Sequence, residues 1–333
     1  MRAVTLSSLF FAAVVGCSAS PHVQFTGSAG SSGTGGAGPS ASASGSGSGS
    51  TASGMGGSGT GGTIGFGGGL AGSGGSTGSG APGCSAAAQL VYVFALDNNI
   101  YSFDPPTKQF TQVATPDCQT TGQPNSMAID RDLIAWLNYF DFNGGALYTF
   151  DLKKKSGCQL AVSLPSAFKQ VGMGFSTDTV GGTAETLYVD GIGGGGLGRI
   201  DMTSKTLVPI GPFGNDPTLT GQSAELTGTG DAKLYGYFTT SPSVRVAQID
   251  KSNAGILSDK VLTGVKPPSD WAFTFWGGDF YLYAAPGSNA TGNSSVIHYS
   301  PATQMVDSTY VADVGFKIIG AGVSTCAPLK PPN

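Results

Sequence analysis

The segment Ala146-Leu147-Tyr148-Thr149-Phe150-Asp151 decides the fold, because its ending recurs along the chain. Four segments close with an apolar residue followed by aspartate, and a degenerate fifth closes with serine. These endings are Phe103-Asp104, Phe150-Asp151, Ile200-Asp201, Ile249-Asp250 and Tyr299-Ser300. They are separated by 47, 50, 49 and 50 residues. A period in this range indicates an array of repeated units, such as the blades of a β-propeller.

Each unit divides into short segments that are rich in β-branched and aromatic residues and are bounded by Gly, Asn, Asp or Pro. In the second unit we expect strands over 126–130, 133–140, 146–151 and 159–162. Four antiparallel strands in nearly fifty residues describe a propeller blade. The sequence therefore predicts an all-β fold in residues 84–333, a propeller of five four-stranded blades, with six blades as the main alternative.

The first unit has no leading strand of its own, because residue 89 opens at once into a second-strand pattern. Residues 316–325 supply the missing pattern at the other end of the chain. The C-terminal strand would then complete the N-terminal blade. This arrangement closes the ring and removes its open edges.

Four cysteines lie in this part of the chain, and in an oxidising compartment they suggest two disulfides out of three possible pairings. In the closed ring, Cys84 and Cys326 come to one face of the same blade, so we expect that pair. Cys118 and Cys158 would then pair by exclusion. A simple strand count puts these two towards opposite faces, and only the long segment 114–123 can bring them together.

Residues 1–16 predict a secretory signal peptide, with Arg2 before a short apolar run and Gly16 before Cys17. The run is too short to span a bilayer. Residues 14–17 resemble the bacterial lipobox, whose cysteine is acylated, so Cys17 is the predicted lipidation site. A signal peptide with a chance cysteine is the alternative. Ser18 stands where an inner-membrane retention signal would carry Asp, which favours the outer membrane or the cell surface.

Residues 17–83 form a predicted disordered linker, because residues 18–83 are mostly Gly, Ser, Ala and Thr and contain no charged side chain. The chain has a formal net charge of −4, or −5 once Arg2 is removed with the signal peptide. This sparse acidic balance argues against nucleic acid as a partner. We expect a monomer held to a membrane by its lipid, an unknown envelope or extracellular ligand, no cofactor and no metal.

This tripartite plan resembles a group of propeller-bearing, Gly/Ser-tethered surface lipoproteins from gliding soil bacteria. The resemblance covers the whole chain and implies the same architecture. The group has no assigned activity, so it implies no catalytic residues. The stretches that carry it are Gly16-Cys17, the linker, 126–130, 224–230, Trp271-Ala272-Phe273 and the closing 320–326.

Three motifs resemble functional sites, but a structural role explains each of them better. The glycines of 191–196 match a dinucleotide fingerprint, but a strand pattern follows where that site needs a helix. His298 lies on a predicted strand with no nucleophile placed beside it in the sequence. Residues 97–99 and 141–144 carry oxygen ligands suited to calcium, yet they lack the bidentate Glu and read as tight turns.

Four residues at or near the start of predicted innermost strands are candidates for ligand binding: Asn125, Ser223, Glu225 and Trp271. If Glu225 faces the central channel, it could bind a cation or act as a general acid or base with a raised pKa. Otherwise it accepts hydrogen bonds from its neighbours. Trp271 could stack on a sugar ring or fill the core.

The favoured hypothesis is a non-enzymatic binding module of the cell envelope, for a protein, peptide or glycan. The alternative is a propeller hydrolase or lyase that uses Glu225 or His298 as its acid/base residue. Strand order further predicts that the lipid anchor arrives on the face of Cys84. The long loops, expected over 138–145, 189–197, 209–222, 238–244 and 284–295, should lie on the opposite face. The long loop 176–185 is the one exception, expected on the anchored face.

Overall fold

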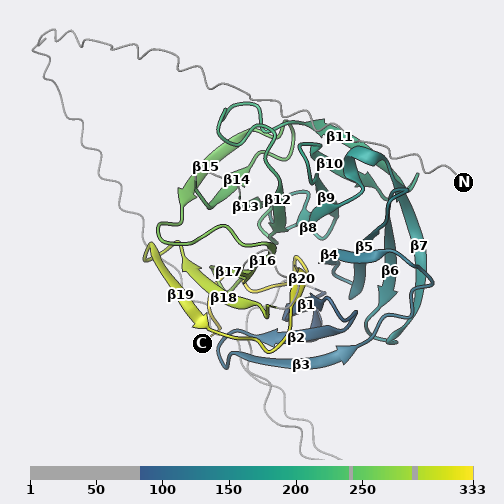
Figure 1. Cartoon of the computed structure of the whole chain (residues 1–333), viewed down its shortest axis with the longest axis horizontal. Coiled ribbons are helices and arrows are strands. Elements are labelled where there is room, and N and C mark those ends of the chain that lie inside the picture. Colours follow the sequence, from purple (N-terminus) through teal and green to yellow (C-terminus); the bar gives the residue numbers. More distant parts are fainter. Residues whose placement is uncertain (1–82, 240–242, 287–291, 333) are drawn as a thin grey trace, which may run out of the picture. The chain divides into compact units, whose positions relative to one another are not determined.

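The computed structural model describes residues 83–239, 243–286 and 292–332. Within them the chain forms a ring of five antiparallel sheets of four strands each (Figure 1). The prediction of an all-β propeller with five four-stranded blades is therefore confirmed. The predicted signal peptide, Cys17 and nearly all of the predicted linker lie outside the described residues.

Each blade runs from an innermost strand at the centre of the ring to an outermost strand at its rim (Figure 1). Blade 1 consists of β20 (Ile318–Val323), β1 (Val91–Ala95), β2 (Ile100–Asp104) and β3 (Gln109–Ala114). Blade 2 consists of β4 (Gln123–Ile129), β5 (Ile134–Phe140), β6 (Gly145–Asp151) and β7 (Ser156–Leu164). Blade 3 consists of β8 (Val171–Thr177), β9 (Glu185–Gly191), β10 (Gly196–Asp201) and β11 (Thr206–Gly211).

Blade 4 consists of β12 (Ala224–Gly228), β13 (Leu234–Phe238), β14 (Arg245–Ile249) and β15 (Ile256–Val261). Blade 5 consists of β16 (Asp270–Trp276), β17 (Asp279–Ala285), β18 (Ser295–Ser300) and β19 (Met305–Val311). Two short 3-10 helices, η1 (Ala87–Gln89) and η2 (Ser166–Phe168), precede β1 and β8. The blades follow one another around the ring in chain order.

The recurring aspartate marks the end of the third strand of a blade and opens the turn to the outermost strand. In blade 3, Asp201 Oδ1 accepts hydrogen bonds from the backbone N–H groups of Thr203 and Ser204, both at 2.9 Å. Lys205 then adopts a left-handed backbone with a φ of 56°. Ile200, directly before the aspartate, is buried in the core. Turn chemistry at one position and burial at the preceding one explain why the pair recurs.

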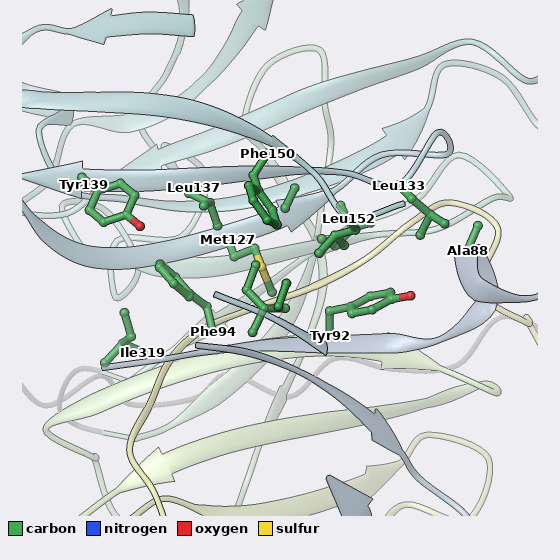
Figure 2. Packing of buried hydrophobic residues seen from close by; sticks show 14 of the residues in the cluster. Ala88, Tyr92, Phe94, Met127, Leu133, Leu137, Tyr139, Phe150, Leu152 and Ile319 are labelled. Atoms are coloured by element: carbon green, nitrogen blue, oxygen red, sulfur yellow. The ribbon is translucent and has the colours of Figure 1, made fainter. Parts of the chain in front are cut away.

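Apolar clusters fill the space between neighbouring blades. Figure 2 shows the cluster between blades 1 and 2, which joins Phe94 of β1, Met127 of β4 and Phe150 of β6, all fully buried. The innermost strands come very close together near the axis of the ring. A Cβ atom added to Gly320 of β20 would lie 2.7 Å from the backbone N of Met127. The glycine is therefore required for β20 to approach β4.

Both predicted disulfides are present. Cys84 and Cys326 have Cα atoms 5.6 Å apart, next to the point where β1 pairs with β20. Cys118 and Cys158 have Cα atoms 4.7 Å apart. The link between β3 and β4 carries Cys118 to the beginning of β7, as the sequence required for this pairing. The C-terminal strand therefore completes blade 1, and a covalent bond secures the closure.

The ring has two faces. We call the face where the innermost strands end, which carries Cys84 and Cys326, the closure face. The opposite one, where they begin, is the loop face, because antiparallel pairing brings the turns 96–99, 141–144 and 192–195 to it. The described part of 284–295 also lies there, since the N–H of Ser294 donates to Phe316 O at 2.9 Å, just before β20. The predicted separation of the loops from Cys84 is confirmed for the described residues.

Candidate functional site

Glu225 lies at the centre of the ring and is closed off from solvent. It is the second residue of β12 and is 2% exposed. Ser126 of β4 donates its hydroxyl to Glu225 Oε2 at 2.9 Å. Since β4 and β12 belong to blades 2 and 4, which are not neighbours, this bond connects two blades across the innermost strand of blade 3. Burial raises the pKa of the Glu225 carboxyl well above its ordinary value, and the side chain joins three blades rather than lining an open channel.

A second buried carboxyl, Asp190 of β9, lies close to Glu225. Its Oδ2 accepts the backbone N–H of Ala224 at 2.6 Å, and burial raises its pKa well above the ordinary value. Gly172, which pairs with Asp190, leaves the space for this contact, because a Cβ there would lie 2.0 Å from Ala224 O. Sequence reasoning missed this role, because Asp190 directly precedes a glycine-rich turn and has the pattern of a turn residue.

The other three candidate residues lie at or just before the start of innermost strands on the loop face. Asn125 donates its amide to Asn138 Oδ1 at 2.9 Å and to Val171 O at 3.0 Å. The Ser223 hydroxyl accepts the N–H of Gly193 at 2.8 Å. Both side chains therefore hold neighbouring blades together. Both are half-buried at the surface of the ring.

Trp271 of β16 is half-buried and packs against the cluster between blades 4 and 5. Its indole N–H is buried without a hydrogen-bond partner among the described residues. The arrangement fits the core role expected for Trp271 better than an open stacking platform. Whether Asn125, Ser223, Glu225 or Trp271 contacts a ligand stays a prediction.

The loop face carries a groove over blade 5, with a volume of about 490 Å³. Two links form its walls, the one before β16 and the one after β19, and the ends of β17 and β18 form its floor. Ala285 and Ile297 are buried in this floor, whereas Lys266 and Asp313 stand exposed at the rim. The full lining is Lys266, Pro267, Pro268, Ala284, Ala285, Pro286, Asn293, Ser295, Ile297, Ala312 and Asp313. Apolar walls with a few charged and amide groups are typical of a binding groove.

Phe142, at the tip of the β5–β6 turn, is the most exposed large apolar side chain among the described residues, at 104%. Asp141 Oδ1 accepts the backbone N–H groups of Asn143 at 2.7 Å and Gly144 at 3.0 Å, which fixes the turn. This supports the turn interpretation of the Asp-Asn segments over calcium binding. Among the described residues, no group of three or more His, Cys, Asp or Glu side chains could hold a metal ion.

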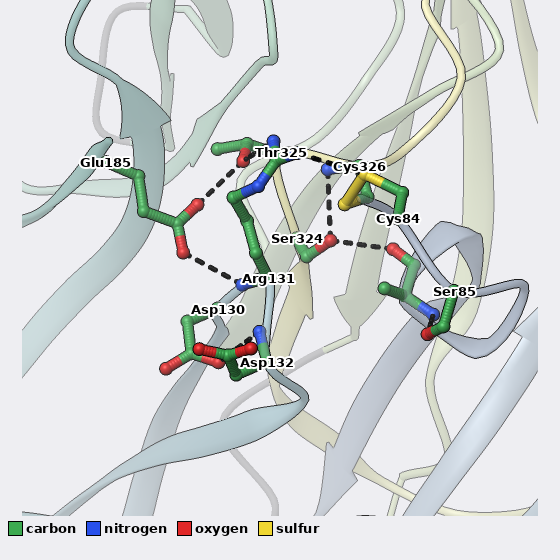
Figure 3. Close-up of a disulfide and its surroundings, with 10 residues drawn as sticks. Cys84, Ser85, Asp130, Arg131, Asp132, Glu185, Ser324, Thr325 and Cys326 are labelled. Carbon is green, nitrogen blue, oxygen red and sulfur yellow. Dashed lines mark hydrogen bonds between the residues drawn. A yellow bond between two sulfur atoms is a disulfide. The ribbon is translucent and has the colours of Figure 1, made fainter. Parts of the chain in front are cut away.

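The closure face carries a polar network around the closing disulfide (Figure 3). Glu185 of β9 accepts the Arg131 backbone N–H at 2.8 Å and the Thr325 hydroxyl at 2.6 Å. The Arg131 guanidinium donates to Thr325 Oγ1 at 3.1 Å and to Cys84 Sγ at 3.2 Å. Burial raises the pKa of Glu185 to about 7. The network connects blades 1, 2 and 3 around the closing disulfide.

The remaining motifs have structural roles. Residues 192–195 form the turn between β9 and β10, and the flanking Gly191 and Gly196 belong to these strands, so the predicted hairpin is confirmed. His298 of β18 pairs its Nε2 with Asp279 Oδ2 at 2.8 Å and lies between the rings of Tyr281 and Tyr310. Its environment is that of a strand residue packed between aromatic side chains.

No protein-family model and no curated protein matches the chain. Solved structures do resemble it. The Kuenenia stuttgartiensis hydrazine synthase has a TM-score of 0.39 at 14% identity and covers 66% of this chain, which spans 62% of that one. A luciferin-regenerating enzyme has a TM-score of 0.44 at 12% identity, with 72% of this chain and 93% of that chain covered.

The extracellular domain of a hybrid two-component system from B. thetaiotaomicron has a TM-score of 0.35 at 12% identity, with 66% of this chain and 26% of that chain covered. These proteins differ in function, so the likenesses concern the fold and assign no activity to this chain. In the described part of the chain, no helix is long and apolar enough to cross a membrane.

Proposed function

We propose that the protein is a lipid-anchored binding module of the bacterial cell envelope. Cys17 carries the lipid, the Gly/Ser-rich linker spans the distance to the propeller, and the loop face meets the ligand. A flexible coil of some sixty-odd residues has a root-mean-square span of roughly 40 to 50 Å, enough to keep the ring clear of the membrane surface. The envelope location and the ligand are parts of this proposal.

The groove over blade 5 is the observation that carries the proposal. It lies on the loop face, opposite Cys84, where the linker joins the ring. Its apolar floor would bury the aliphatic or aromatic part of a ligand, while Lys266 and Asp313 at the rim would select its charged or polar groups. A short extended segment of a protein fits this chemistry.

The structure argues against Glu225 as the acid/base residue of an enzyme. A general acid or base must reach the reacting group of a substrate, and Glu225 is sealed between the blades with its Oε2 engaged by Ser126. A catalytic site in the channel would need several carboxylates that point towards one another. In the described part of the chain, the carboxylate beside Glu225 is that of Asp190, which is itself fully buried. We therefore favour binding over hydrolysis or elimination.

The groove can be tested with a random peptide library displayed on phage. We expect the full chain with Cys17→Ala to enrich peptides that combine apolar residues with a charged residue. Lys266→Glu together with Ala312→Trp should abolish the enrichment, because the first reverses the charge at the rim and the second fills the groove. Leu329→Ser, at an exposed site on the closure face, is the matched control. Equal enrichment by all three proteins would overturn the assignment of the site.

The anchor has its own test. Expressed in a bacterium that acylates lipoproteins, the wild-type chain should partition into the detergent phase of a Triton X-114 extract. Cys17→Ala should move it to the aqueous phase. If both forms partition alike, the lipid anchor is wrong, and the binding groove is judged separately by the peptide experiment.

A further inference from the structure

Phe142 is fully exposed although it lies on a turn that is held rigidly in place. A phenylalanine in water contributes nothing to the stability of its own ring, and an isolated exposed aromatic residue on a fixed backbone has the form of an interface anchor. The turn is also braced from blade 1, since the Tyr139 hydroxyl, three residues earlier, donates to Asn98 Oδ1 at 2.5 Å. Leu96, in that blade 1 turn, is 45% exposed.

The groove over blade 5 has a position that matches Phe142. Phe142 lies on the turn between the second and third strands of blade 2, and the floor of the groove is formed by the ends of the second and third strands of blade 5. Both features therefore lie on the loop face at the same distance from the axis, counted in strands. One is an apolar projection and the other is a hollow with an apolar floor.

The order of blades around the ring relates the two features by symmetry. When two copies meet loop face to loop face, a two-fold axis that runs through blade 1 of each copy places blade 2 of one copy over blade 5 of the other. The same operation places the second Phe142 over the second groove. A single arrangement thus satisfies both projections and both grooves, and it leaves no unmatched end for further growth.

We propose that the loop face binds the loop face of a second copy of this chain, with Phe142 of each copy seated in the blade 5 groove of the other. The proposal rests on the proposed function and names the partner of that same site. The rim carries one charge of each sign, so Asp141, beside Phe142, is attracted by Lys266 and repelled by Asp313, and the pairing rests on shape rather than on charge. Leu96 of blade 1 lies near the two-fold axis and meets its own copy.

The arrangement has a consequence for the membrane. The two closure faces point in opposite directions in such a pair, so the two linkers leave on opposite sides. The long flexible linker lets copies on one membrane pair at high surface density, and pairs also form between two membranes that approach each other. This pairing departs from the monomer expected from the sequence. A contact built on two projections and two grooves is small, so we expect a Kd on the order of 100 µM for one pair. Many pairs acting together would hold two membranes more tightly than one pair does.

Sedimentation velocity of the full chain with Cys17→Ala tests the pairing. Wild type should shift from monomer to dimer between about 10 µM and 1 mM, as expected for a weak interface. Phe142→Ser should remain monomeric over this range. Met305→Ser, which removes another exposed apolar side chain from the outermost strand of blade 5, should dimerise as wild type does. Thermal melting checks that all three are folded.

A mixing experiment distinguishes the specific contact from general stickiness. Ala312→Trp fills the groove and, like Phe142→Ser, should be monomeric alone. When the two variants are mixed, Phe142 of the first can still enter the open groove of the second. The mixture should therefore form heterodimers, with one contact of the two and roughly tenfold weaker than wild type or more. The comparison is made at about 1 mM of each variant. A mixture that sediments no faster there than either variant alone, while wild type dimerises, would contradict the knob-in-groove arrangement.

Vesicles give the membrane readout. Neutral phosphatidylcholine vesicles that carry the chain through an N-terminal histidine tag and a nickel-chelating lipid should aggregate with wild type and disperse with Phe142→Ser. Wild type that neither dimerises at 1 mM nor aggregates vesicles overturns this inference. The proposed function fails separately, if the peptide library shows no enrichment that depends on the groove.

Discussion

The closure face and the loop face of the ring use their side chains differently. On the closure face, a disulfide closes the ring, and the Glu185 carboxylate forms its hydrogen bonds with groups of the same chain. On the loop face, Phe142 projects into solvent from a fixed turn, and a groove lies open over blade 5. The difference suggests that one face is built for stability and the other for contact. Changes on the closure face should therefore affect unfolding, and changes on the loop face should affect binding.

The largest effect is expected from the closing disulfide. Cys84 and Cys326 are 242 residues apart, against 40 for Cys118 and Cys158. On the chain-entropy model, removing the first by alanine substitution costs roughly 5 kcal/mol of unfolding free energy and removing the second roughly 4 kcal/mol. Guanidinium denaturation of the two double variants measures the difference. A greater loss from the Cys118–Cys158 pair would contradict the view that the closure face holds the ring.

Next in size is the central carboxyl. Glu225→Ala leaves a cavity and removes the partner of the buried Ser126 hydroxyl, so we expect a loss of about 3 kcal/mol. Glu225→Gln keeps the volume and an acceptor and should cost less than about 1 kcal/mol near pH 5.

The pH dependence of these variants has a definite sign. Because burial raises the pKa of Glu225 in the folded state, the unfolded chain releases its proton first as the pH rises. The free energy of unfolding is therefore highest below the pKa of Glu225 in the unfolded chain. It decreases as the pH rises from there towards the raised pKa of the folded state. Glu225→Gln lacks this decrease, so its free energy of unfolding should rise relative to that of wild type between pH 5 and pH 8. A steeper pH dependence in the variant would show that Glu225 is ionised in the fold.

A smaller pH effect should come from Glu185 on the closure face. Its pKa is raised from 4.5 to about 7, so wild type loses stability as the pH rises through that interval. Allowing for partial solvent screening, we expect a loss of about 2 kcal/mol, which Glu185→Gln should remove. Urea denaturation at pH 4.5, 6 and 7.5 gives the profile. If both proteins have parallel profiles, Glu185 does not titrate as its burial implies.

The smallest effect on stability is expected on the loop face. Asp141→Ala removes the two bonds that fix the turn, at a cost of about 1 kcal/mol or less, and Phe142→Ser should change stability by no more than about 0.5 kcal/mol. Self-association should nevertheless be weakened by the first and abolished by the second. Strong destabilisation by Phe142→Ser would mean that its ring packs within the molecule, and the contrast between the two faces would be lost.

The blade number, the closure and both disulfides were predictable because they depend on patterns along the chain. The pair Ile200-Asp201 shows why: a buried residue followed by a turn aspartate has the same local cause in every blade. The C-terminal strand could be assigned to blade 1 because a propeller unit needs four strands and the first had three.

The sequence left two alternatives for Glu225, and the structure agrees with the one in which it accepts hydrogen bonds from its neighbours. The choice between them and the role of Asp190 could not be predicted. Both depend on how closely β12 approaches β8 and β4, and this distance is set by Gly172 and its neighbours across blades. The groove was equally hidden, because its walls come from two links that are distant in sequence. From the sequence, Phe142 could be assigned only to the predicted turn 141–144. Its exposure follows from the rigid geometry of residues 141–144, which point it away from the core.

Hydroxyl-radical footprinting tests the contrast between the faces most directly. Full-length protein on vesicles would be labelled once at low surface density and once where vesicles are packed against one another. We predict that contact protects Phe142, Pro267 and Pro268 on the loop face and leaves Leu90 and Leu329 on the closure face unchanged. Protection of the closure face, with Phe142 labelled equally in both states, would contradict the account.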